Sequence, residues 1–256
     1  SGNGGGATDA AYQISVGPET VIPLIGFGAG KFGTSTFNVG GTSSVSLRQW
    51  SQSNFGEDLV FGPRGGAPYY WDNTNAVTTR GVALSSLSGA SNTPTVQNLI
   101  FVSDINRFVF CFGTNTLGTT TQDPLLFRWS DQEDAANWTP SSTNQSGSLR
   151  LSRGTKIVAV EQSNQAVNIW TDSSLYNLQF LGGQAVFGVQ LVGDNISIAS
   201  QNAVAFANGV SYWMGNDRFY KYDGRVQTLN CSLLRHVIND INIVQLDQVF
   251  TGTNKE

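Results

Sequence analysis

The stretch KIVAVEQSNQAVNIWTDSSLYNLQFLGG, residues 156–183, contains the pattern that decides the fold. It pairs two runs of strand-forming residues, which end at Gln162 and Trp170, across a short loop that contains Ser163 and Asn164. Two such runs around a polar loop are typical of a β-hairpin. The run LYNLQFL follows as a third strand, so the stretch predicts one small antiparallel sheet.

The same pattern recurs along the chain. Three further hairpins are predicted, by DLVFGPRGGAPYYW at 58–71, NLIFVSDINRFVFCF at 98–112 and AVAFANGVSYW at 203–213. Third strands follow as LLFRW and RFYKYDG. The aromatic ends of the second arms lie 41, 58 and 43 residues apart, at Trp71, Phe112, Trp170 and Trp213. Two of these intervals match the roughly 40–45 residues of a four-stranded propeller blade, and the third contains an insertion of about 15 residues.

The composition agrees with this fold class. The chain has 29 glycines, 12% charged residues and 39% hydrophobic residues, which suits many strands joined by tight turns. The sequence therefore predicts an all-β fold, a β-propeller of antiparallel three- to four-stranded blades over 44–256. Residues 1–43 are expected to be a Gly-rich arm or the first strands. One short helix is predicted near 231–241, where CSLLRHVINDI has helical spacing.

The end of the chain has a strand pattern without a return arm. After the predicted helix, VQLDQVFTGTNKE begins another strand and stops in what reads as a turn. Because a lone strand leaves its backbone groups unpaired, we expect the natural polypeptide to continue beyond 256, or the missing arm to come from elsewhere. The propeller is therefore not required to be complete in this chain.

The charged residues and cysteines limit the possible functions. The net charge is −4 and no two basic residues are adjacent, whereas tight phosphate-backbone binding needs clustered Lys and Arg. Transient passage of DNA is compatible with this pattern. No apolar run reaches the roughly 18 residues of a membrane span, so no membrane partner is expected. Cys111 and Cys231 are predicted to be buried free thiols.

The segment SDQEDAANW, residues 130–138, is the strongest candidate for a site. Asp131, Glu133 and Asn137 have the alternating placement of a calcium loop in the Asp131–Asp134 turn, but the turn glycine and the terminal bidentate Glu are absent. Catalytic carboxylate pairs are commonly held by different elements, whereas these come from one loop. The favoured interpretation is a turn whose side chains cap backbone N–H groups, with Trp129 and Trp138 packed beside it. Calcium binding remains an alternative.

Other motifs give no support for catalysis. GAGKFG, Gly28–Gly33, lacks both the P-loop positions and a following helix, and His236 is the single histidine of the chain. We therefore expect a protein that is not an enzyme, with no catalytic residue, cofactor or resident metal. The recurring aromatic residues are expected to be structural rather than a sugar platform; they are Trp71, Phe112, Trp170, Trp213, Trp129 and Trp138.

Several strings resemble one family, the tail nozzle proteins of short-tailed bacteriophages, also called packaged-DNA stabilisation proteins. The resembling strings are LRQWSQSNFGEDLVFGPRGGAPYYWD, LFRWSDQEDAANWTP, VNIWTDSSLYNLQFLGG and GVSYWMGNDRFYKYDGRVQTLNCSLLRHVINDIN. They cover much of residues 47–242, in the order that the family has. The stretch GFGAGKFG is similar to the family's Gly-Trp-rich segment, with phenylalanine in place of tryptophan.

The resemblance implies a virion structural protein. Such a subunit is a β-propeller that assembles as a hexameric ring below the portal and adaptor, extends the DNA channel and helps to retain or release the genome. The family polypeptide is longer and continues where this chain stops at Glu256. The alternative is a carbohydrate-binding or glycoside-hydrolysing tail propeller, which would need Asp131, Asp172 and Asp223 to converge; a generic propeller scaffold is a third hypothesis.

Overall fold

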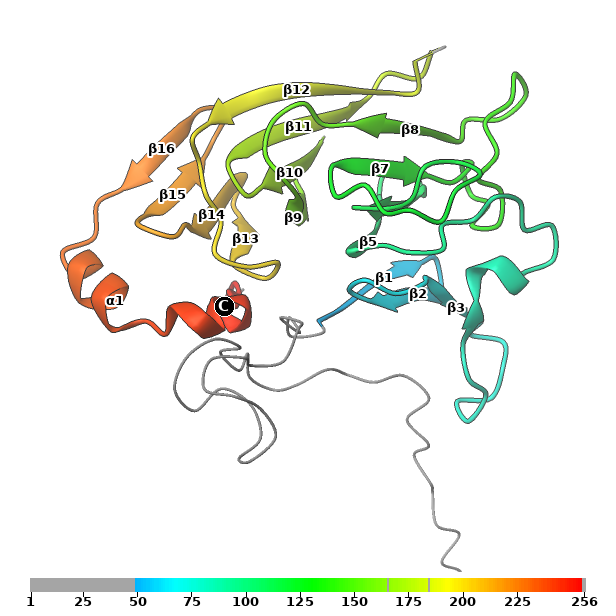
Figure 1. Ribbon diagram of the computed structural model, residues 1–256, viewed down its shortest axis with the longest axis horizontal. Helices are drawn as coiled ribbons and strands as arrows, with labels where there is room; N and C mark the ends of the chain where they lie inside the picture. Colours follow the sequence, from blue (N-terminus) through cyan, green and yellow to red (C-terminus); the bar gives the residue numbers. More distant parts are fainter. Residues whose placement is uncertain (1–48, 165, 184, 255–256) are drawn as a thin grey trace, which may run out of the picture. The chain divides into compact units, whose positions relative to one another are not determined.

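The computed structural model describes residues 49–254, except 165 and 184. The Gly-rich segment 1–43 and the GAGKFG motif, on which predictions were made, lie outside the described residues. The described chain contains four antiparallel sheets of four strands each (Figure 1). The prediction of an all-β fold with one short α-helix is therefore confirmed for this part of the chain.

Each sheet is formed by four strands that are consecutive in the sequence. The first sheet contains β1 (Trp50–Phe55), β2 (Asp58–Pro63), β3 (Tyr69–Trp71) and β4 (Val82–Ala83). The second contains β5 (Leu99–Val102), β6 (Val109–Phe112), β7 (Leu126–Trp129) and β8 (Gly147–Arg150). The third contains β9 (Ile157–Gln162), β10 (Val167–Thr171), β11 (Ser174–Phe180) and β12 (Phe187–Asp194). The fourth contains β13 (Val204–Ala207), β14 (Val210–Met214), β15 (Phe219–Tyr222) and β16 (Val226–Leu229).

All four predicted hairpins are present, as the pairs β2–β3, β5–β6, β9–β10 and β13–β14. In the first sheet, however, β1 precedes the hairpin, so Trp71 lies in a third strand. Phe112, Trp170 and Trp213 lie in second strands. The 41-residue interval from Trp71 to Phe112 thus joins positions that are not equivalent. The first strands of the sheets begin at residues 50, 99, 157 and 204, and so 49, 58 and 47 residues apart.

The sheets pack on one another in chain order through three apolar clusters. One cluster joins the first two sheets and includes Val60 and Cys111; the next joins the second and third sheets around Phe110. A third cluster joins the third and fourth sheets around Trp170 and Trp213. Because the middle sheets are covered on both faces, their second strands β6 and β10 are buried along their whole length. All four residues of β6, VFCF, are buried.

The first strands of successive sheets contact one another. The backbone N–H of Ile100 donates to the hydroxyl of Ser51 at 2.8 Å, and that of Val102 donates to Ser53 at 3.1 Å. Since both residue numbers rise together along the two strands, β1 and β5 run in the same direction. Further contacts join β5 to β9 and β9 to β13.

The last part of the chain differs in part from its prediction. The predicted helix is present as α1 (Leu234–Asp240), but VQLDQ is not a strand, because η2, a 3-10 helix, spans Ile243–Gln248. Leu246 and Val249 pack on the apolar cluster of the fourth sheet, and this burial outweighs their strand propensity. A further short 3-10 helix, η1, spans Leu84–Ser86.

Residues 243–251, here named the C-terminal connector, reach two sheets. The N–H of Thr251 donates to the carbonyl oxygen of Asn202 at 2.8 Å, beside a parallel bridge between Asn202 and Phe250. Asp247 accepts a hydrogen bond from Nη2 of Arg64 at 2.8 Å. The connector therefore links the segment before β13, in the fourth sheet, to the residue that follows β2, in the first.

Candidate functional site

The acidic segment between β7 and β8 forms a turn in which the carboxylates bind the chain itself. Oδ1 of Asp131 accepts hydrogen bonds from the backbone N–H groups of Gln132 and Gln145, both at 2.8 Å. Oδ1 of Asp134 accepts one from the N–H of Ala136 at 2.9 Å. Side-chain to backbone hydrogen bonds of this kind stabilise a turn, so they favour a structural role over a ligand site.

The two tryptophans that flank this turn are buried. Trp129 donates its indole N–H to the carbonyl oxygen of Gln145 at 2.7 Å, and Trp138 donates to that of Ala135 at 2.8 Å. The ring of Trp129 thus joins Gln145 to the second sheet, and the ring of Trp138 packs in the apolar cluster that contains Cys111. Within the described residues, no three His, Cys, Asp or Glu side chains are grouped so that they could hold a metal ion.

Replacing Asp131 with alanine is expected to lower the free energy of unfolding by about 1–3 kcal/mol, because two backbone N–H groups lose their acceptor. Urea denaturation measures the effect. The control is Glu133→Ala, since this exposed carboxylate has only a 3.9 Å ion pair with Arg107 and its loss should cost less than about 0.5 kcal/mol. Equal losses in the two variants would contradict the capping role, and a calcium-dependent shift of the unmodified protein would favour the metal alternative.

Three of the four recurring aromatic residues are inside the protein. Trp170 and Trp213 have exposed fractions of 0% and 2%, and their rings meet edge to face with centroids 5.4 Å apart. Phe112 is buried and stacks on Phe127. Trp71 is half-buried, and its indole N–H donates to a backbone oxygen. Rings buried in different sheets do not form a shared platform for a sugar.

The three aspartates of the carbohydrate alternative occupy different kinds of turn. Asp172 follows a second strand, β10, whereas Asp131 and Asp223 follow third strands, β7 and β15. Turns after second and third strands lie at opposite ends of an antiparallel meander. Asp172 accepts hydrogen bonds from the N–H and the hydroxyl of Thr155 at 2.7 and 2.6 Å, and Asp223 lies 3.2 Å from Nζ of Lys221. Burial acts to raise the pKa of Asp172, but these hydrogen bonds outweigh it and lower the pKa.

Basic side chains in the described residues are distributed over the sheets, and six of the eleven lie within 4.0 Å of an acidic oxygen. The ion pairs are Arg64–Asp247, Arg107–Glu133, Arg150–Asp123, Arg153–Asp194, Arg218–Asp217 and Lys221–Asp223. Exposed pairs of this kind contribute little stability. They do, however, neutralise the cations locally, so these residues do not form a basic surface for a phosphate backbone.

A groove of about 780 Å³ runs along the first strands of the sheets. Its lining comes from β1, β5, β9, β13 and the C-terminal connector, and it includes Ser51, Ser53, Gln201 and Asn202. We name it the first-strand groove. Its volume is in the range of small-ligand pockets and is too small for a DNA duplex. No sequence motif indicates this groove, because it arises from packing between sheets.

Glu161 is the charged side chain that lines the described part of this groove. Burial raises the pKa of Glu161, and a hydrogen bond from the backbone N–H of Phe206 opposes this change. A carboxyl group with a raised pKa binds its proton more tightly in the folded protein than in the unfolded chain. Glu161 therefore destabilises the fold as the pH rises above the unfolded pKa of about 4.3.

Replacing Glu161 with glutamine is expected to raise the free energy of unfolding at pH 7, because the variant needs no buried charge and keeps an acceptor for Phe206. The gain should vanish below about pH 4, where the carboxyl of the unfolded chain is also protonated. Denaturation at several pH values measures this. Glu57→Gln, at an exposed residue, removes the same charge and should give no such pH-dependent gain. A variant less stable than the unmodified protein at pH 7 would contradict the prediction.

Two features of the described residues differ from the sequence expectations. Cys231 is exposed, so the prediction of two buried thiols was wrong for this residue, whereas Cys111 is buried. Arg128, in the strand LLFRW, has an exposed fraction of only 2%. A cation inside an apolar strand was the signal that could have indicated a buried site there, since arginine is rarely buried without a partner.

His236 lies on α1 and is exposed, as expected for a helix-surface residue. Among the described residues, none of the helices combines the length and the apolar character that crossing a bilayer requires. No protein-family model matches the chain, and no curated protein matches its sequence.

Proposed function

We propose that this chain is a non-enzymatic structural subunit of a phage tail. In this proposal the four sheets are blades of a β-propeller, and copies of the subunit assemble as a ring, hexameric by the family resemblance. The ring extends the DNA channel of the portal and adaptor and helps to retain or release the genome. The proposal rests on the resembling strings, on the arrangement of the sheets and on the distribution of charge.

The repeated arrangement of the sheets is the observation that best supports the propeller proposal. Four sheets with the same strand order contact one another through their first strands, and apolar clusters fill the space between neighbours. In a propeller the first strand of each blade lies nearest the axis. The first-strand groove is then the axial opening within one subunit, and the DNA path belongs to the ring of subunits.

The distribution of charge supports a surface along which DNA slides. Ion pairing of six of the eleven described basic residues and a carboxylate in the groove reduce the number of cations that could hold phosphates. We expect duplex DNA to bind the purified protein more weakly than a dissociation constant of about 10⁻⁴ M at physiological salt. Fluorescence anisotropy with a labelled duplex measures this value.

Exposed apolar side chains on the end sheets support assembly. Trp50 in β1, which also lines the first-strand groove, and Tyr212 in β14 are each 39% exposed. On the first sheet the ring of Trp50 stacks on Phe61, which in turn stacks on Tyr69. Contiguous exposed apolar groups of this kind commonly mark interfaces between proteins.

The test combines mass photometry and cryo-EM of the purified chain with antibody labelling of phage particles. The proposal expects a closed ring of several copies and labelling at the tail. Two matched variants test whether Trp50 lies in the interface between subunits. Trp50→Glu should prevent assembly of the ring, whereas Val77→Glu, at an exposed residue, should leave the ring intact. A monomer at every concentration together with unlabelled particles would overturn the proposal, and glycan hydrolysis in a substrate screen would favour the carbohydrate alternative.

A further inference from the structure

Arg128 is a buried cation in the second sheet. It lies in β7, opposite Cys111 of β6 and Ser148 of β8. Because side chains on paired positions of a sheet point to the same face, Arg128 shares the face of Cys111, which packs toward the first sheet. The guanidinium therefore lies between two sheets, with only 2% of the residue exposed.

The contacts of this guanidinium satisfy only part of it. Nη2 donates to the carbonyl oxygens of Asn92 at 2.5 Å and Trp138 at 3.3 Å. The central carbon lies 5.9 Å from the ring centroid of Trp138. Nη1 is buried and has no hydrogen-bond partner among the described residues. A buried donor without a partner is costly, and more so when it carries charge.

No carboxylate compensates this charge within the described residues that surround it. Burial lowers the pKa of Arg128, and the neighbouring ionisable group is the thiol of Cys111, which burial keeps protonated. A water molecule could accept the hydrogen bond of Nη1 but would leave the positive charge without a counterion. An anion at this place would both accept the hydrogen bond of Nη1 and balance the charge of Arg128.

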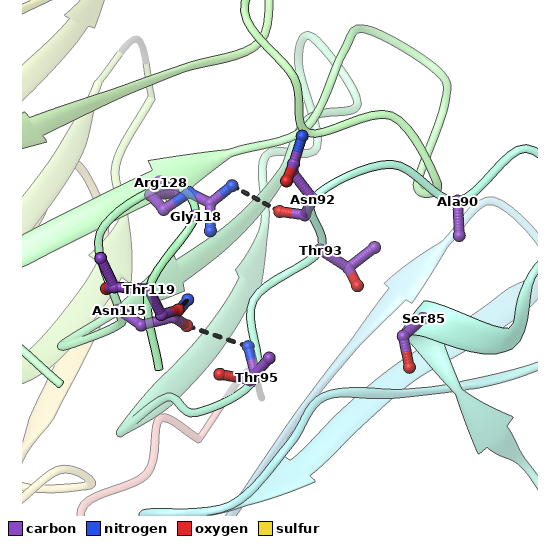
Figure 2. Close-up of a pocket in the computed structure, with 9 residues that line it drawn as sticks. All are labelled: Ser85, Ala90, Asn92, Thr93, Thr95, Asn115, Gly118, Thr119 and Arg128. Carbon is purple, nitrogen blue, oxygen red and sulfur yellow. Dashed lines mark hydrogen bonds between the residues drawn. The ribbon is translucent and has the colours of Figure 1, made fainter. Parts of the chain in front are cut away.

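A polar pocket of about 320 Å³ lies beside the guanidinium. Figure 2 shows Arg128 at one side, with one terminal nitrogen bonded to the carbonyl oxygen of Asn92 and the other turned away from it. The hydroxyl-bearing residues Ser85, Thr93 and Thr95 line the same pocket (Figure 2). None of these three hydroxyls donates a hydrogen bond to another described residue, so they remain available as donors to a ligand.

We propose that this pocket binds a phosphate group, either free or carried by a small phosphate ester. A tetrahedral oxyanion can accept hydrogen bonds from the arginine and from hydroxyls in several directions. A planar carboxylate instead suits two parallel N–H donors of one guanidinium, and Nη2 of Arg128 is already engaged by carbonyl oxygens. The single unpartnered Nη1 with several hydroxyls therefore favours the tetrahedral anion. This inference does not depend on the proposed function.

Isothermal titration calorimetry of the full chain with inorganic phosphate tests the proposal. Titration with a nucleoside monophosphate distinguishes a phosphate ester from the free ion, and acetate probes a carboxylate, all at matched ionic strength in sodium chloride. We expect saturable binding of inorganic phosphate, of the monophosphate, or of both, and no binding of acetate. Absence of binding by both phosphates, or equal binding of acetate, would overturn the proposal.

Two variants and a matched control locate the binding. Thr93→Val with Thr95→Val keeps the side-chain shapes and should weaken phosphate affinity at least about tenfold. Arg128→Met should abolish binding, whereas Arg150→Met, which removes an exposed cation from the same sheet, should leave affinity unchanged. If Arg128→Met does not fold, the phosphate affinity of the double threonine variant tests the site instead. Unchanged affinity in the threonine variant, or equal losses in the two arginine variants, would refute this site.

Discussion

Replacing Phe110 with alanine is expected to lower the free energy of unfolding by about 3–5 kcal/mol, among the largest effects for a single core residue. Phe110 is fully buried between the second and third sheets. Its ring contacts Phe187 at a centroid distance of 5.1 Å and stacks on Phe112 at 5.8 Å. Since partners from two sheets surround the ring, the structure cannot close the cavity by moving one side chain.

Denaturation in guanidinium chloride measures this loss. The matched control is Phe180→Ala, because Phe180 contacts the same cluster but is 37% exposed. It should lose no more than about half as much, since less of its surface is removed from water on folding. Equal losses in the two variants would show that burial between the sheets is not what makes Phe110 important.

Replacing Gly154 with alanine is expected to lower the free energy of unfolding by about 2–4 kcal/mol. Gly154 precedes β9 and has φ of +91°, a backbone conformation that residues with a Cβ rarely adopt. A Cβ at this position would also lie 2.5 Å from Oγ1 of Thr171 and 2.7 Å from Oδ1 of Asp172. The substitution therefore adds backbone strain to a steric clash.

The variant Gly224→Ala separates these two causes. Gly224 has φ of +105°, but no atom lies within 4 Å of a Cβ built there. It should lose only the strain, about 1–2 kcal/mol, in the same denaturation experiment. If the two glycine variants lost equal stability, the clash with Thr171 and Asp172 would make no contribution to the loss at Gly154.

The hairpins could be predicted from sequence because their determinants are local. Alternating runs on both sides of Ser163 and Asn164, or of Asn208 and Gly209, specify a turn and two paired strands without reference to the rest of the chain. The capping interpretation of Asp131 could be proposed for the same reason, since an Asp side chain reaches the N–H groups of its own turn.

Features that depend on contacts between distant segments could not be predicted. The strand β1 and the fourth strands β4, β8, β12 and β16 have two to eight residues, and they gain their place by pairing with a neighbouring strand of their sheet. The connector residues were predicted as a strand, yet the burial of Leu246 and Val249 favours a 3-10 helix. Glu161 and Arg128 were read only as parts of strands, because their burial results from the faces of neighbouring sheets.

The C-terminal connector also bears on the order in which the protein folds. Arg64 and Asp247, which it brings together, are separated by 183 residues, whereas each hairpin closes over a few. Chain closure costs more entropy as the separation grows, so hairpins form in about 1–10 μs and the connector docks only after both end sheets exist. The amide hydrogen of Thr251 should therefore exchange with deuterium sooner than those of β6, which would show that the connector opens before the second sheet.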